Sequence, residues 1–254
     1  MSPWLEALRR HDEAGSACVL VTLTATAGSS PREAGAKMVV STDSAEGTLG
    51  GGTVELLAQQ RARELLSAGE AGVRQEDFVL NDELDQACGG RMTLLFEPLY
   101  PPALQVAVFG AGHVGRALVH ALEAVNCRIH WVDSREGQFP EVVPANVRCH
   151  TLPAPASIIP SLPAGTRLLA MSQSHELDLE VVAAALLRDD IPLVGTIGSA
   201  TKRGRFLHRL REMGLGEAAA QRLVCPVGLP GVGGKAPGEI AIAVAAQLLA
   251  TMRP

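Results

Sequence analysis

Three glycine-rich loops in this chain stand where backbone N–H groups could bind an anion. They are Gly50-Gly51-Gly52, Gly110-Ala111-Gly112-His113-Val114-Gly115, and the run from Gly228 to Lys235. Apolar residues at helical spacing follow each loop, so each is predicted to open a helix. The first N–H groups of a helix have no partner within it, which makes such a terminus suitable for phosphate. The loops therefore predict a phosphate-bearing ligand.

The middle loop has the surroundings of a dinucleotide-binding unit. It follows an apolar run over 106–109 and precedes a predicted helix over 116–124. A second predicted strand, 128–132, ends in Asp133, at about the distance, roughly 20 residues, where such units place an acid for a ribose hydroxyl. Gly110, Gly112, Gly115 and Asp133 are thus candidate cofactor-binding residues. A protein can keep this fold after it has lost the ability to bind the ligand. The pattern therefore predicts the fold and leaves open whether a nucleotide occupies the site.

Polar residues follow two later predicted strands, over 167–172 and 192–197. The first is followed by His175, and the second by Ser199, Lys202 and Arg203. Cations in the first turn oppose the helix dipole, and an anion held between them and the helix terminus would remove that conflict. The alternative is that Lys202 and Arg203 continue a solvated face formed by the arginines that follow them.

The third loop resembles a P-loop without matching it. Leu229 stands where the first glycine of GxxxxGK would be, and Ala236 offers no hydroxyl to a magnesium ion. ATP hydrolysis by that route is not supported. Lys235 stays a candidate phosphate contact.

Further candidate ligand-binding groups lie in the first hundred residues. Ser29, Ser30, Arg32 and Lys37 bring hydroxyls and two cations to one loop between predicted strands, a set suited to oxyanions. Cys88 precedes two glycines, so its thiol would be approachable, although a small half-buried hydrophobic role would also explain it.

No catalytic motif accompanies these loops. The chain has no GxSxG, no HExxH and no EF-hand loop. The sequence therefore predicts a protein that holds a ligand rather than one that transforms it.

Composition predicts two modest domains and excludes several functional classes. The 254 residues carry a formal net charge of −5, so no overall attraction to nucleic acid or anionic membrane is expected. The five cysteines are scattered and never form CxxC, which argues against a disulfide framework or a zinc knuckle. No signal peptide or spanning segment is recognisable, so we expect a soluble, cytoplasmic protein.

Two prolines, Pro101 and Pro102, mark the expected domain boundary. Residues 1–100 are predicted to form a small α+β domain. It has helices over 4–10 and after residue 52, and strands near 17–25, 36–41, 75–80 and 91–96. Residues 103–254 read as a Rossmann-like doubly wound parallel sheet, with strands near 106–109, 128–133, 147–151, 167–172 and 192–197 and a closing helix over 237–252.

Six motifs in one order resemble the xanthine dehydrogenase accessory protein family, of the XdhC/CoxI type. They are Gly28-Ser29-Ser30-Pro31-Arg32 with Gly35 to Met38; Gly50-Gly51-Gly52 with Glu55; Cys88-Gly89-Gly90; Gly110 to Gly115; Ile197-Gly198-Ser199 with Lys202, Arg203, Arg205 and Phe206; and Cys225 to Pro230 with Gly233, Lys235 and Pro237. The resemblance covers nearly the whole chain. One departure is Gln173, where the family pattern leads us to expect a histidine.

The resemblance implies a maturation factor rather than an enzyme. Such a protein binds molybdenum cofactor (molybdopterin), holds it for sulfuration by a cysteine desulfurase, and delivers it to the molybdenum subunit of apo xanthine dehydrogenase or a related hydroxylase. The resemblance also implies a homodimer. Cys88 or, on its own loop, Cys225 is then the candidate thiolate ligand for molybdenum.

Two other readings compete with this one. An NAD(P)-dependent oxidoreductase would place Asp133 on the ribose and use His175 as acid and base, but no substrate-binding set accompanies the glycine motif. A nucleotide-sensing regulatory module would need a partner surface that the sequence does not reveal.

Overall fold

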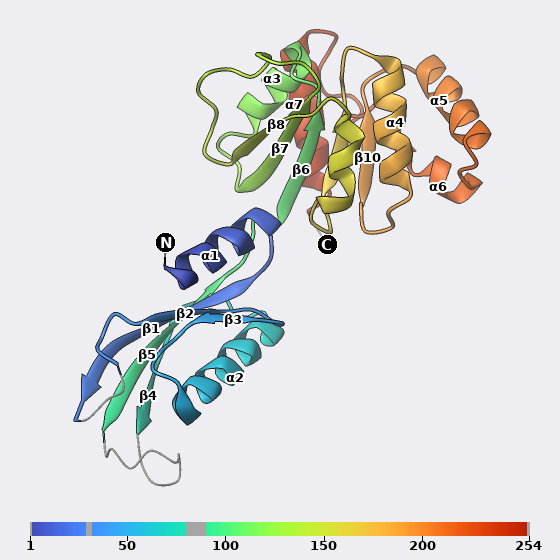
Figure 1. Ribbon diagram of the computed structural model, residues 1–254. Helices are drawn as coiled ribbons and strands as arrows, with labels where there is room; N and C mark the ends of the chain where they lie inside the picture. Colours follow the sequence, from blue (N-terminus) through green and yellow to red (C-terminus); the bar gives the residue numbers. More distant parts are fainter. Residues whose placement is uncertain (1, 29–31, 80–89, 253–254) are drawn as a thin grey trace. The chain divides into compact units, whose positions relative to one another are not determined.

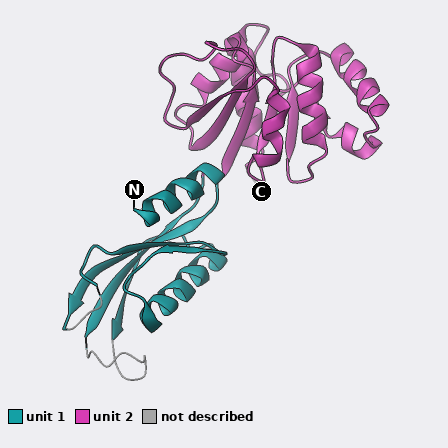
Figure 2. Cartoon of the chain, in the orientation of Figure 1, with its two compact units in different colours: residues 1–101 teal, residues 102–254 magenta. Residues whose placement is uncertain are grey.

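The computed structural model describes residues 2–28, 32–79 and 90–252. The chain forms two compact units, residues 1–101 and 102–254 (Figure 2). Each has its own hydrophobic core. The predicted Ser29, Ser30 and Cys88 contacts lie outside the described residues.

The first unit is an antiparallel sheet with a helix on each face. Its elements are α1 (Pro3–Ala14), β1 (Cys18–Ala27), β2 (Lys37–Val40), β3 (Ala45–Gly47), α2 (Gly52–Ala68), β4 (Arg74–Val79) and β5 (Arg91–Leu99). The strands lie in the order β3-β2-β1-β5-β4, and every neighbouring pair is antiparallel. The short β3 was not expected from the sequence.

Period-3.6 spacing explains how α2 packs. Its buried residues Val54, Ala58, Ala62 and Leu65 recur every three or four positions and form one stripe. That stripe meets alternate residues of β1 and β5 in the core of the unit. A smaller cluster that includes Ala7 holds α1 against the opposite face.

The second unit is a six-stranded parallel sheet. Its elements are β6 (Leu104–Phe109), α3 (His113–Ala121), β7 (Cys127–Asp133), β8 (Val147–Thr151), η2 (Pro155–Ser161), β9 (Arg167–Ala170), α4 (His175–Leu186), β10 (Leu193–Thr196), α5 (Ala200–Glu212), α6 (Glu217–Gln221), β11 (Leu223–Val224) and α7 (Pro237–Ala250). The order β11-β10-β9-β6-β7-β8 is the doubly wound order of a dinucleotide-binding fold. The predicted fold class is confirmed.

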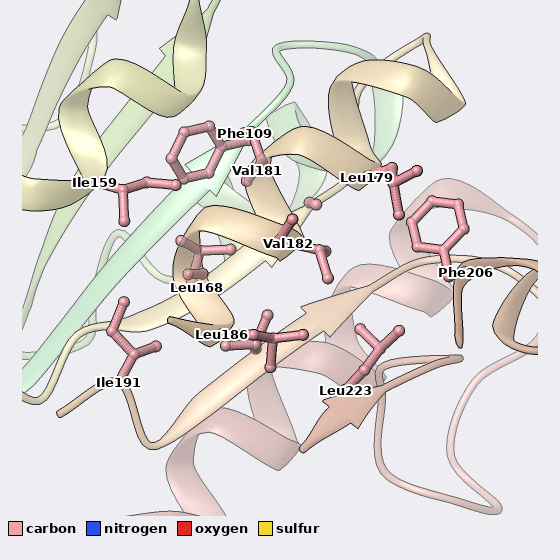
Figure 3. Close-up of a cluster of buried hydrophobic side chains, with 14 of the residues drawn as sticks. Phe109, Ile159, Leu168, Leu179, Val181, Val182, Leu186, Ile191, Phe206 and Leu223 are labelled. Carbon is pink, nitrogen blue, oxygen red and sulfur yellow. The ribbon is translucent and has the colours of Figure 1, made fainter. Parts of the chain in front are cut away.

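Helices cover both faces of this sheet, as Figure 1 shows. One core joins α3 and α7 to the sheet and includes Trp131 and Leu118. The other, drawn in Figure 3, joins η2, α4 and α5 to the opposite face through residues such as Phe109, Val182 and Phe206. All six residues of β6 are consequently buried.

The chain reverses its direction across the sheet between β6 and β9. These neighbours are parallel, with Phe109 opposite Ala170, and the strands that follow each of them run outwards on opposite sides. Ligands of open α/β sheets bind at such a switch point, beyond the carboxyl ends of the strands. In the part of the chain that the structure describes, no helix is long and apolar enough to cross a bilayer.

Candidate functional site

A cleft of about 570 Å³ lies at this switch point, where β6 ends and α3 begins. Its volume falls in the range of about 300–1,000 Å³ that small-molecule sites occupy. Residues from the ends of β6, β7, β9 and β10 and from α3 line it: Ala111, Gly112, His113, Val114, Arg116, Arg135, Gln138, Met171, Ser172, Gln173, Ile197 and Pro237.

The three glycines of the middle loop have three different physical roles. Gly110 has φ +119°, and a Cβ there would lie 2.5 Å from the Met171 carbonyl oxygen. A Cβ on Gly115 would lie 2.1 Å from the Gly110 carbonyl oxygen, where the helix packs on the turn. Gly112 faces open space, because beyond the adjoining backbone no described atom lies within 4 Å of its would-be Cβ. Tight turn, close helix packing and open approach are the roles that the dinucleotide-binding motif requires.

The start of α3 offers backbone donors to the cleft. Gly112 is the N-cap, and among the described residues no side chain caps the helix there. The first-turn N–H groups, including that of His113, therefore have no partner within the helix. The helix dipole adds positive potential at the same place.

Asp133 is held by the protein itself. Its Oδ2 accepts from the Ala111 N–H at 2.7 Å and from Arg135 Nη2 at 3.0 Å, while its Oδ1 accepts from Arg135 N and Nε at 3.0 Å each. Burial would raise the pKa of this carboxyl, but these hydrogen bonds outweigh it and hold the pKa below the ordinary value. The side chain is 1% exposed. The predicted contact of Asp133 with a ribose stays a prediction, and in the structure its carboxylate is occupied by Ala111 and Arg135.

Two arginines line the cleft, and one of them, Arg135, is paired with Asp133. Arg116 donates from Nε to the Ala111 carbonyl at 3.0 Å and from Nη2 to the Gln138 carbonyl. The side chain of Arg135, which also lines the cleft, is 38% exposed. The lining residues, all from the described part of the chain, include these arginines and His113 but no carboxylate. The arrangement can bind an anion through charge and donors together.

Lys202, a predicted ligand contact, is not among the residues that line the cleft. Its ammonium donates to Asp178 Oδ2 at 2.8 Å, Thr196 Oγ1 at 3.2 Å and the Ile197 carbonyl at 2.9 Å. All three donors of the ammonium are engaged by the protein. The conflict between a cation and the helix dipole is resolved by Asp178, not by a ligand.

The neighbours of Lys202 on α5 are also explained by the protein. Ser199 is the N-cap and accepts from the Lys202 N–H, and half-buried Arg203 donates to Gln221 Oε1 at 3.2 Å. Neither residue lines the cleft.

The Gly50-Gly51-Gly52 loop, which is predicted to bind a phosphate, has a carboxylate of the protein beside it. Glu55 Oε2 accepts from the N–H groups of Leu49 at 2.8 Å and Gly51 at 3.0 Å. It also accepts from Thr48 Oγ1 at 2.6 Å. Burial raises the pKa of Glu55, yet these donors lower it further than burial raises it. The Glu55 carboxylate thus occupies N–H groups that a phosphate would otherwise bind.

The remaining predicted contacts are not among the residues that line the cleft. Lys37 donates to Thr22 Oγ1 at 2.8 Å and lies over the Trp4 ring, and Arg32 also belongs to the first unit. Lys235 is exposed before α7 and does not line the cleft. Of the three glycine loops, the middle one contributes lining residues to this cleft, and Pro237, just after the third, also lines it.

Cys225, the rival of Cys88 for a metal, is buried. Its Sγ lies 3.7 Å from the Ser199 carbonyl oxygen, and burial raises the pKa of the thiol, with the weaker field of Lys202 opposing that rise. The described residues contain no group of three or more His, Cys, Asp or Glu that could hold a metal ion.

His175 lies at the start of α4 in a separate pocket. That pocket, of about 300 Å³, also includes Arg205 and Phe206 from α5. His175 thus lines this second pocket and not the cleft.

Sequence reasoning missed Arg116 and Arg135. A signal was present for Arg135, because an arginine two residues after the strand-terminal acid is close enough to pair with it. Gln173, singled out only as a departure from the family pattern, proves to line the cleft.

Comparison with known proteins agrees with this geometry. The family model described as the XdhC Rossmann domain matches residues 106–248, which include the cleft and its glycine loop. The chain belongs to the XdhC family. The model of the XdhC and CoxI family matches residues 11–77 in the first unit.

Two similar proteins extend the comparison. Uncharacterized protein YqeB of Escherichia coli K12 is 30% identical over 230 residues, which cover 87% of this chain but 41% of that protein. The chain thus spans well under half of the curated relative it matches. A Bacillus halodurans protein whose crystal structure is described as that of a xanthine dehydrogenase is 20% identical, with TM-score 0.50, over 100% of this chain and 96% of its own. At that identity the likeness concerns the fold.

Proposed function

We propose that this XdhC-family chain binds molybdenum cofactor, holds it for sulfuration by a cysteine desulfurase, and inserts it into apo xanthine dehydrogenase or a related molybdenum hydroxylase. The observation that carries the proposal is a cleft lined by two arginines and by the start of α3, where no described side chain caps the helix N–H groups. Family membership supports the maturation role.

The residues of the cleft fit a phosphorylated pterin. The α3 N–H groups, Arg116 and Arg135 suit the phosphate, and open space at Gly112 admits it close to the backbone. Gln173, exposed at the cleft edge, offers an amide that can both donate to and accept from the pterin ring. When bound, the cofactor supplies the molybdenum centre on which hydroxylase chemistry depends; this chain's residues bind and orient it.

The oxidoreductase reading has less support. Asp133, its ribose ligand, is fully hydrogen-bonded to Ala111 and Arg135. His175, its acid and base, lines another pocket. We therefore propose that the chain does not turn over NAD(P)H.

The test is retention of cofactor by the purified full chain from a host that makes it. We expect bound molybdenum by metal analysis, a fluorescent pterin after oxidation, and activation of apo xanthine dehydrogenase on transfer. Absence of pterin, or steady-state hydride transfer to a small carbonyl substrate, would contradict the proposal. Self-association stays a prediction, which light scattering of the same sample tests.

A further inference from the structure

At the β7 end of the cleft, the acid that would bind a ribose in a dinucleotide-binding fold is already hydrogen-bonded within the protein. In dinucleotide-binding folds an acid at the end of the second strand accepts from the ribose hydroxyls. Here Asp133 occupies that position, yet both of its oxygens accept from Arg135, and Oδ2 also accepts from Ala111. A ribose diol would find this acceptor already taken.

Arg135 presents the opposite chemistry to the cleft. Its Nε and one Nη2 hydrogen are used by Asp133, which leaves three of the five guanidinium N–H groups. Within the described ranges, those three donate to no protein acceptor that the structure records. Two of them, on Nη1 and Nη2, form a parallel fork that matches two oxygens of a phosphate.

Asp133 makes this fork rigid. The bidentate contact, at 3.0 Å for each of Nε–Oδ1 and Nη2–Oδ2, fixes the guanidinium plane, and the Ala111 N–H fixes the carboxylate. Less side-chain entropy is then lost when an anion binds. Arg116, which also lines the cleft, adds a second guanidinium, and the Asp133 carboxylate that offsets the charge of Arg135 is not itself among the lining residues.

We propose that Arg135 makes this end of the cleft a site for a phosphate monoester, and that Asp133 positions Arg135 instead of binding a ribose. The ligand class is an organic phosphate whose dianionic end lies where the ribose diol of an unphosphorylated dinucleotide would lie. The inference rests on the proposed function in one respect, that this cleft is the cofactor site. It favours a cofactor that ends in a phosphate over one that is extended by an unphosphorylated nucleoside.

The pair NADP⁺ and NAD⁺ tests this recognition, because the two differ by one phosphate monoester on a ribose. We expect calorimetric titration of the full chain to give at least tenfold tighter binding of NADP⁺. Arg135→Ala removes the fork and exposes the Asp133 carboxylate. It should weaken NADP⁺ at least tenfold and strengthen NAD⁺, which reverses the preference.

Controls separate recognition from folding and from total charge. Arg211→Ala removes an arginine from another bidentate carboxylate pair, with Glu217, away from the cleft, and should leave the preference unchanged. Arg135→Gln keeps one donor group without charge and should show an intermediate preference. Thermal unfolding of each variant confirms that it is folded.

A chain that binds NAD⁺ as tightly as NADP⁺, binds neither probe at millimolar concentration, or keeps its preference in Arg135→Ala would overturn the inference. Molybdenum retention is measured separately. Loss of retention with the phosphate preference intact contradicts the proposed function alone, whereas retention without the preference contradicts this inference alone.

Discussion

Lys202 and Asp178 form a buried ion pair, with Nζ 2.8 Å from Oδ2 and side chains 8% and 1% exposed. The pair joins the first turn of α5 to α4, and Asp178 Oδ1 also accepts from the Ser172 N–H at 2.8 Å. Because Ser172 lines the cleft, this contact fixes one of its walls. Lys202, which the sequence pattern predicts to bind a ligand, thus stabilises a wall of the cleft through Asp178 without lining it.

Replacing Lys202 with Met should destabilise the protein by about 3–5 kcal/mol, because it leaves Asp178 buried without its cation. The double variant Lys202→Met with Asp178→Asn should lose less than the sum of the two single losses. Urea unfolding measures each value. Arg211→Met, which breaks an exposed pair with Glu217, should move the midpoint little. A Lys202→Met midpoint equal to that of the parent would refute the structural role.

Gly112→Ser should separate ligand binding from stability. Gly112 has φ −76° and open space beside it, so a serine fits, and serine is a good N-cap residue. Its Oγ would then take first-turn N–H groups and occupy the approach of a phosphate. We expect at least tenfold weaker cofactor retention with an unchanged or slightly raised unfolding midpoint.

Gly115→Ala is the matched comparison for that variant. Its added carbon would meet the Gly110 carbonyl oxygen at 2.1 Å, so the helix or the turn must shift. A loss of about 1–3 kcal/mol in unfolding free energy is expected, as for other overpacked sites. Equal stability of the two glycine variants would contradict the separate roles assigned to Gly112 and Gly115.

Glu55→Gln should destabilise the first unit by about 1–3 kcal/mol, because a neutral amide cannot replace a carboxylate that accepts from Leu49, Gly51 and Thr48. The folded pKa of Glu55 is below its unfolded value, so the stabilisation is present above the unfolded pKa and lost as pH falls through the folded pKa. The parent should therefore lose more stability on acidification than Glu55→Gln does. Gln60, exposed on the same helix, offers a neutral control as Gln60→Ala.

His130 should make the second unit sensitive to mild acid. Burial, followed by the charges of His150, Arg148 and Arg128, lowers the pKa of His130 from 6.5 to about 4. The unfolded chain therefore binds more protons between these values, and stability falls as pH decreases from about 6.5 to about 4. Between pH 7.5 and 5.0 the parent should lose on the order of 2 kcal/mol more than His130→Leu. His120→Ala, at a site 86% exposed, should follow the parent.

The fold was predictable because its signals are periodic. Alternating strands and helices after Pro102 predicted the doubly wound sheet, and the apolar run over 106–109 predicted the strand that the structure shows as β6. The helix α3 begins at His113, three residues before the expected Arg116, because its first turn lies within the glycine motif, where apolar spacing carries no signal.

The site was predictable only in part. The glycine motif located the cleft, because its roles depend on backbone geometry. Partners that are distant in sequence could not be predicted for the other donors and cations, as with Asp178, which accepts from Lys202 24 positions away. Glu55 is the opposite case, because its hydrogen bonds to Leu49 and Gly51 are local in sequence. A carboxylate three residues after Gly52 could therefore have been predicted to accept from the loop N–H groups.

The central claim is that this chain holds molybdenum cofactor in the cleft beside Gly112. The most direct measurement is the amount of molybdenum and of pterin retained per chain after purification from a cofactor-producing host, for the parent and for Gly112→Ser. The account predicts near-equal, near-stoichiometric molybdenum and pterin on the parent and loss of both from the folded variant. Parent protein free of pterin, or a variant that retains both in full, would contradict it.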